Sequence, residues 1–201
     1  YLRGEYPRAQ TVVARALEEA ETANLLGDDI LGSGFNLKLK LVKGHGAYIC
    51  GEETSLLRSL EGVPAQVSPK PPYPAVKGFR GAPTLVHNVE SLATYPTIIN
   101  DGGARYAQLG YGRTRGTKLI SLNTAVKRPG LYEVECGTTI RTLIFDLAGG
   151  MAEGLVFKAV QIGGPLGGIL DKSQLDLPLD FEAFDQANAL LGHAGAVVFD
   201  Q

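Results

Sequence analysis

The chain has 201 residues, of which 44% are hydrophobic, and a formal net charge of −2 at pH 7. This length permits one large or two small domains, and the near-neutral charge gives no reason to expect nucleic acid or an anionic membrane as partner. No window approaches the run of about 18 apolar residues that a membrane helix needs, so direct membrane insertion is not expected. The first residue is Tyr1, not Met, and we therefore expect a piece of a longer polypeptide.

The cysteines, histidines and glycines indicate which kinds of site the chain can contain. Cys50 and Cys136 stand in apolar or glycine-rich surroundings, so we expect buried structural thiols without a disulfide framework. Three widely separated histidines and the absence of a CxxC pair predict no metal site. The 26 glycines are clustered rather than periodic, which indicates tight turns and loops that approach a ligand closely.

The first elements form a helix and a strand. Pro7 suits the first turn of a helix, and apolar residues at helical spacing extend the prediction over Ala9–Leu26, with Gly27 as its C-terminal stop. Residues 35–42 alternate between leucine or phenylalanine and polar side chains, which predicts a half-buried strand.

The strand leads into the stretch Gly44–Gly62, GHGAYICGEETSLLRSLEG. Its glycines permit close backbone approach to a ligand, and Glu52 and Glu53 begin a helix predicted to run to Glu61. Acids at a helix start complement the helix dipole but repel phosphate. This loop therefore favours N–H and O–H donors, such as the edge of a heterocycle or a ribityl chain.

A proline-rich connection follows, over residues 63–83, which excludes regular helix and central strand and suggests a functional covering segment. Lys70 lies within it, between prolines. Asn88 is a good N-cap for the next helix, which Pro96 is expected to bend or end.

The second half predicts a small α+β module. Lys118–Asn123 and Leu131–Glu135 are predicted strands joined by a KRPG turn, and Thr138–Leu147 is a predicted helix. The remaining predictions are strands at Phe157–Ile162, Leu175–Leu179 and Ala196–Phe199, a GGPLGG loop at residues 163–168 and a helix at Phe181–Leu191.

Each candidate also has a purely structural interpretation. Gly44–Gly62 is equally well explained as a strand–helix turn with acidic capping residues, because glycine loops before helices are common. Lys70 by itself indicates a surface lysine, and His87 with Asn88 indicates only a helix start.

Two strings carry a resemblance to a known family: GAYICGEETSLLRSLEG and PKPPYPAVKGFRGAPTLVHNVESLAT. They resemble the flavin-bearing NADH dehydrogenase subunit of complex I and of related NAD-reducing hydrogenases and NAD-dependent formate dehydrogenases. YLRGEYP, KRPGLYEV and GHAGAVVFD extend the likeness over nearly the whole chain. The resemblance implies an α/β fold: the C-terminal part of an FMN/NADH-binding domain over residues 1–112, then a soluble-ligand-binding β-grasp-like module over residues 113–201.

The resemblance also implies site residues, cofactors and partners. Hydride would pass between NAD(H) and FMN, with onward electron transfer to iron–sulfur clusters. The family's main glycine-rich FMN motif and its four-cysteine 4Fe-4S site match nothing in these residues, so the isolated segment is expected to be inactive. No catalytic acid or base is implied, and His87 departs from the asparagine usual in the family. The implied cofactor-binding residues are Tyr48, Gly51, Glu52, Glu53, Lys70, His87 and Asn88.

The implied partners are a 2Fe-2S thioredoxin-like subunit and a larger iron–sulfur subunit, in a cytoplasmic complex that can be peripheral to the inner membrane. The alternative hypothesis is a non-catalytic docking or ligand-binding module of a larger redox complex.

Overall fold

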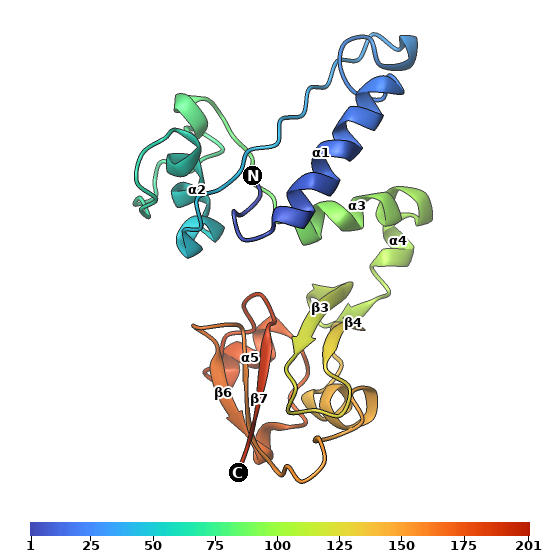
Figure 1. The fold of residues 1–201 in the computed structure, drawn as a ribbon, viewed down its shortest axis with the longest axis vertical. Helices are drawn as coiled ribbons and strands as arrows, with labels where there is room; N and C mark the ends of the chain where they lie inside the picture. Colours follow the sequence, from blue (N-terminus) through green and yellow to red (C-terminus); the bar gives the residue numbers. More distant parts are fainter. The chain divides into compact units, whose positions relative to one another are not determined.

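The structure is a computed structural model that describes all of residues 1–201. The chain divides into two compact units, Tyr1–Asn88 and Val89–Gln201, and each is described by itself (Figure 1). None of the helices combines the length and hydropathy needed to cross a bilayer.

The first unit begins with α1 (Pro7–Thr22), which has proline at its first turn as predicted. The helix ends four residues before the predicted Leu26, because Asn24 takes a left-handed backbone conformation (φ +54°) that turns the chain away from the helix axis. No residue of α1 is buried, and Leu17 and Ala20 of its apolar stripe are half-buried.

The predicted strand over residues 35–42 is wrong. These residues form no ladder, and the only bridges in this region join Leu37 to Gly27 and Lys43 to Leu2. Phe35 and Leu39 are 61% and 51% exposed. Alternating hydrophobicity suits one face of a sheet, but a strand also needs a neighbouring strand for its backbone groups, and this unit provides none.

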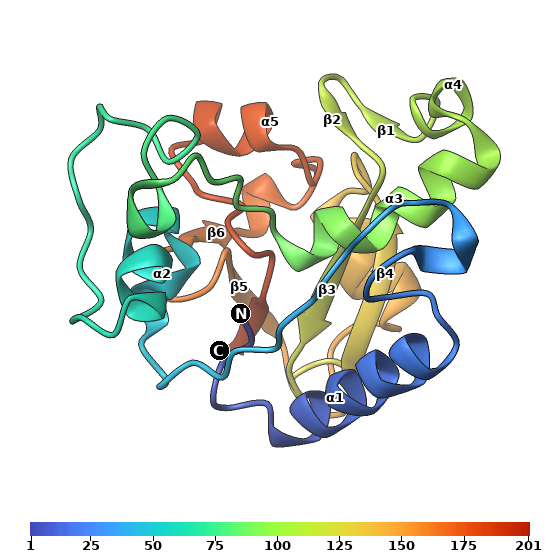
Figure 2. The same cartoon turned by 90° about the horizontal axis from the view of Figure 1, so that it is seen from above.

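The predicted helix after the glycine loop is confirmed as α2 (Glu53–Leu60). A 3-10 turn, Tyr48–Gly51, leads into it, and a second, Phe79–Gly81, lies in the proline-rich connection. Residues 63–83 contain no regular helix or strand beyond that turn, as predicted. Figure 2 shows the connection passing around the outside of α2.

The second unit opens with α3 (Val89–Asp101), directly after Asn88. Pro96 lies inside this helix and does not end it, because a proline removes one N–H donor while the following residues can still bond to the preceding turn. α4 (Gly103–Tyr106) follows, and then a short antiparallel pair that the sequence did not predict, β1 (Gly110–Tyr111) with β2 (Thr114–Arg115).

A five-stranded mixed sheet forms the body of this unit, in the order β4-β3-β7-β5-β6. The predicted strands are confirmed as β3 (Thr117–Leu122), β4 (Gly130–Glu135), β5 (Phe157–Ile162) and β7 (Ala196–Asp200). β3 and β7, the first and last strands, run parallel at the centre, and every other pair is antiparallel. This is the topology of a β-grasp module, as the resemblance implied.

The core of the unit lies between this sheet and the helical segment that ends at Leu147. Ile140, Leu143 and Ile144 are fully buried and join Ile120 and Phe184 in one hydrophobic cluster. The predicted helix is present here, but residues 142–147 are wound as a π-helix.

Two predictions near the C-terminus need correction, and one strand was not predicted. Leu175–Leu179 is not a strand, because Asp171 caps a 3-10 turn (Lys172–Gln174) just before it and only one bridge, Thr139 to Pro178, follows. The real edge strand is β6 (Gly168–Asp171), which is too short to show an alternating pattern. α5 spans Phe181–Gln186 and ends before the predicted Leu191.

Candidate functional site

The start of α2 is held by Glu52. Its Oε2 accepts hydrogen bonds from the backbone N–H groups of Thr54 and Ser55, at 2.8 and 3.1 Å, and from the Thr54 hydroxyl. These bonds satisfy donors that a helix end otherwise leaves free. Glu52 is therefore the N-cap of α2, as its position in the sequence predicted.

Lys70 reaches both acids of the loop. Its Nζ lies 3.1 Å from Glu52 Oε1 and 2.6 Å from Glu53 Oε1. The structure therefore brings together three of the seven predicted site residues from two separate segments. The sequence contained no signal for this contact, because Lys70 lies in an irregular connection whose path follows no periodicity.

These contacts favour the charged forms of the Glu52 carboxyl group and the Lys70 amino group. Burial acts to raise the pKa of Glu52, but its bonds from Thr54, Ser55 and Lys70 outweigh burial and lower that pKa. The contacts with Glu53 and then Glu52 raise the pKa of Lys70. Two carboxylates and one ammonium leave a net charge of minus one at this helix start, which still disfavours phosphate there.

Further hydrogen bonds tie the proline-rich connection to α2, one of them from Arg58 Nε to the Pro64 carbonyl at 3.1 Å. The Ser68 N–H donates to Thr54 Oγ1 at 2.9 Å, and the Arg80 N–H donates to Glu61 Oε1 at 2.7 Å. A cavity of about 460 Å³, lined among others by Arg58, lies between helix and connection. Residues 63–83 are thus held against α2 by hydrogen bonds, and we call this segment the cover. Sequence reasoning missed the anchoring roles of Thr54 and Glu61, which no motif marks.

The glycines of the loop serve different purposes. A side chain at Gly44 would meet the ring of Tyr1 within 3 Å, so this glycine is explained by packing inside the chain. Nothing lies within 4 Å of the position that a side chain would take at Gly51. The open space next to Glu52 and Glu53 is therefore at Gly51, where a ligand could approach the backbone.

Tyr48, His87 and Asn88 are the remaining predicted residues. Tyr48 is 48% exposed, and the Arg3 guanidinium lies 5.4 Å from the centroid of its ring, a distance typical of a cation–π contact. His87 and Asn88 are the last residues of the first unit and directly precede α3.

Together these features define a helical and loop-rich segment with a charged, glycine-bordered helix start, followed by a β-grasp module. The family model that matches the chain is the Nuo51 FMN-binding domain, over residues 1–97. This match includes all seven predicted site residues.

This chain aligns over its whole length with other proteins. It is 42% identical to the NADP-reducing hydrogenase subunit HndC of Solidesulfovibrio fructosivorans and 46% identical to a subunit of the NADH-quinone oxidoreductase of Salmonella typhimurium. All of this chain is covered in both cases, but only 41% and 45% of those proteins. The chain thus spans less than half the length of these relatives.

A solved structure gives the same result. The crystal structure of an NAD+-reducing NiFe-hydrogenase in the air-oxidized state matches with a TM-score of 0.83 and 35% identity, covering 100% of this chain and 32% of that one. The resemblance that the sequence motifs indicated, to flavoprotein subunits of complex I and NAD-reducing hydrogenases, is thereby confirmed.

Proposed function

We propose that this chain forms part of an FMN- and NADH-binding site, and that the full-length protein transfers hydride between NAD(H) and FMN. The observation that carries the proposal is the ion pair of Lys70 with Glu52 and Glu53 beside the open space at Gly51. FMN, when bound, supplies the redox chemistry, and the protein supplies binding and orientation.

The residues divide this task between them. Glu52 is occupied by the helix cap and by Lys70, so it fixes the loop. Glu53 has only one oxygen committed to Lys70, and its other oxygen can accept a hydrogen bond from a ligand N–H or O–H group. Lys70 offsets one of the two negative charges, and Gly51 permits close approach. Tyr48, His87 and Asn88 complete the proposed binding residues.

The proposal extends to the parent complex. We expect a 4Fe-4S cluster whose ligands lie outside these residues, a 2Fe-2S thioredoxin-like partner subunit and a larger iron–sulfur subunit. The expected location is cytoplasmic, with any membrane attachment made through the complex. The same resemblance leaves residues 1–112 and 113–201 as the proposed FMN/NADH-binding and β-grasp domains.

Two substitutions test the site in the full-length protein: Glu53→Gln and Lys70→Ala. Each removes a charge-assisted hydrogen bond, and we expect NADH affinity to fall by about tenfold. Flavin reduction by NADH, followed by stopped-flow absorbance, measures this effect. Matched controls are Glu18→Gln and Lys40→Ala, which alter exposed residues. Unchanged affinity and unchanged flavin reduction in both test variants would refute the assignment.

A non-catalytic role of the isolated chain is tested separately by titrating FMN against residues 1–201 and following flavin fluorescence. Saturable stoichiometric quenching would show that these residues bind flavin by themselves. Absence of quenching would favour a docking or ligand-binding role for the segment and would assign FMN binding to the longer protein.

A further inference from the structure

The β-grasp unit contains a cavity that the proposed flavin site does not use. Its volume is about 490 Å³, within the range of small-molecule sites. All of its lining residues belong to Val89–Gln201, so its shape depends on this unit alone. Its lining includes the exposed residues Arg141, Val156 and Lys172, so the cavity is open to solvent and a ligand could enter it.

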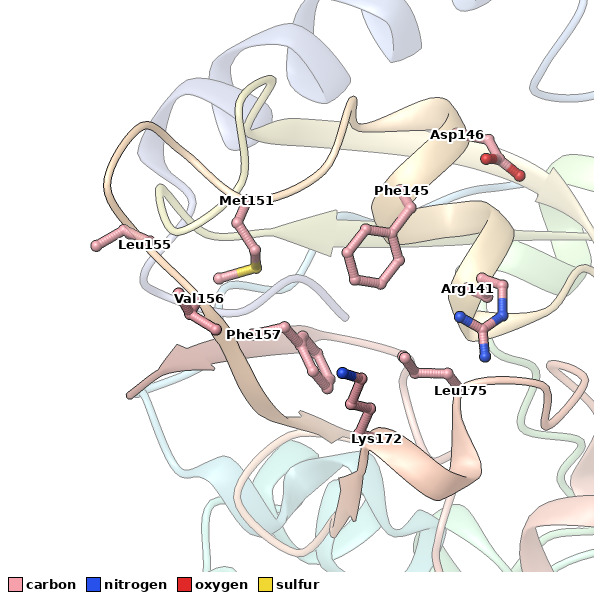
Figure 3. A pocket seen from close by; sticks show the side chains of 9 residues that line it. All are labelled: Arg141, Phe145, Asp146, Met151, Leu155, Val156, Phe157, Lys172 and Leu175. Atoms are coloured by element: carbon pink, nitrogen blue, oxygen red, sulfur yellow. The ribbon is translucent and has the colours of Figure 1, made fainter.

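The floor of the cavity is apolar and includes two aromatic rings. Phe145 and Phe157 meet edge to face, with ring centroids 5.9 Å apart and planes at 61°. Leu175 and Phe157 are buried, with 1% and 8% of their surface exposed. Figure 3 shows the Met151 side chain beside both rings. An apolar body placed against these side chains would be removed from water, which is the main favourable term in such binding.

One cation remains available at the rim. Arg141 is committed to Asp176 through two bonds, Nε to Oδ1 at 2.7 Å and a terminal nitrogen to Oδ2 at 2.9 Å. Lys172 also lines the cavity and has no ion-pair partner in the chain. In Figure 3 its side chain extends toward Phe157, whereas the Asp146 carboxylate points away from the rings.

We propose that this cavity is a binding site for a small aromatic carboxylate. The aromatic part of the ligand lies against Phe145 and Phe157, and its carboxylate pairs with Lys172. An apolar floor with one convergent charge is the usual composition of a small-molecule site. Arg141 is paired with Asp176, and the Asp146 carboxylate points away from the rings. Lys172 is therefore the charged group that faces a bound ligand, and it favours an anion.

The test uses the full-length protein and a fluorinated probe, 4-(4-fluorophenyl)butyrate, with 4-(4-fluorophenyl)butan-1-ol and the corresponding amine as matched compounds. Fluorine NMR titration measures the dissociation constant of each. We expect saturable binding of the carboxylate in the millimolar range or tighter, at least about threefold stronger than that of the alcohol, and weakened by added salt.

Variants connect the binding to the cavity. Lys172→Met keeps an unbranched side chain one atom shorter and removes its charge, so affinity for the carboxylate should fall to that of the alcohol, while Lys172→Arg should retain most of the wild-type affinity. Lys158→Met makes the same charge change at an exposed residue of β5 outside the cavity and should have no effect. Lys172 is exposed and its side chain makes no hydrogen bond or ion pair within the chain, so circular dichroism should show an intact fold.

Three results would overturn the proposal: no saturable binding of the carboxylate up to about 5 mM, equal or tighter binding of the alcohol or the amine, or equal loss in Lys172→Met and Lys158→Met. None of them bears on the flavin site, because Lys172 belongs to the other unit.

Discussion

At the scale of single residues, Glu52 links the architecture of the loop to its charge. One oxygen caps α2 and the other holds Lys70. Because Glu52 both caps α2 and binds Lys70, it couples the stability of the helix to the position of the proline-rich connection. This coupling makes Glu52 a positioning residue, while Glu53 retains an oxygen for a ligand.

Replacing Glu52 with Gln should destabilise the protein by about 1 kcal/mol, because the amide oxygen can still cap α2 but the charge that strengthens these hydrogen bonds and pairs with Lys70 is lost. The folded-state pKa of Glu52 is lowered from its ordinary value of 4.5. The charge of Glu52 therefore stabilises the fold above that value, and this contribution is lost as pH falls through the folded-state pKa.

Urea unfolding of wild type and variant at neutral pH and at about pH 3 measures this effect. The difference between the two proteins should shrink in acid. The matched control, Glu18→Gln on exposed α1, should unfold like wild type at both pH values. A difference that grows toward acid pH would contradict the assignment.

At the scale of elements, the junction of the two central strands depends on one side chain. β3 and β7 share a single register pair, Leu122 with Ala196. Asn123 continues the pairing beyond it: its amide donates to the Val198 carbonyl at 3.0 Å, and its Oδ1 accepts from the Val198 N–H at 2.9 Å. The side chain thus takes the place of a neighbouring strand for two backbone groups.

Asn123→Ala should therefore cost about 1–3 kcal/mol, because Val198 is 2% exposed and its backbone groups would lose their partners away from water. Chemical denaturation provides the measurement. Gln108→Ala, at an exposed residue after α4, removes an amide without such a role. If both variants were equally stable, Asn123 would not be holding the strands together.

At the scale of the molecule, the two units differ in how much core they contain. The main cluster of buried side chains lies wholly within the β-grasp unit. In the first unit the buried hydrophobic residues are only Leu26, Cys50 and Leu57. Stability should therefore be distributed unevenly along the chain.

Hydrogen exchange followed by mass spectrometry should show this difference. We expect slow exchange in β3, β5 and β7, and fast exchange over residues 35–42, whose backbone groups have almost no ladder partners. Exchange over α2 should be intermediate, since its cap and its contacts with the proline-rich connection protect it. Uniform exchange across both units would contradict this distribution.

The sequence alone determined those elements that a pattern of neighbouring residues is enough to predict. The acid-capped helix after the glycine loop, the irregular proline-rich connection and four strands of the β-grasp sheet follow from capping chemistry, missing N–H donors and alternating hydrophobicity. The family motifs also identified the residues of the proposed site. These signals lie within a few neighbouring residues, so no knowledge of the fold is needed to recognise them.

Only the tertiary structure decided which residues meet. It placed Lys70 between Glu52 and Glu53, left residues 35–42 without a partner strand, and showed that Gly44 accommodates Tyr1 while Gly51 borders open space. It also formed the Lys172 cavity from segments that no motif connects. Contacts between distant segments depend on the path of the whole chain, and a local pattern contains no record of that path.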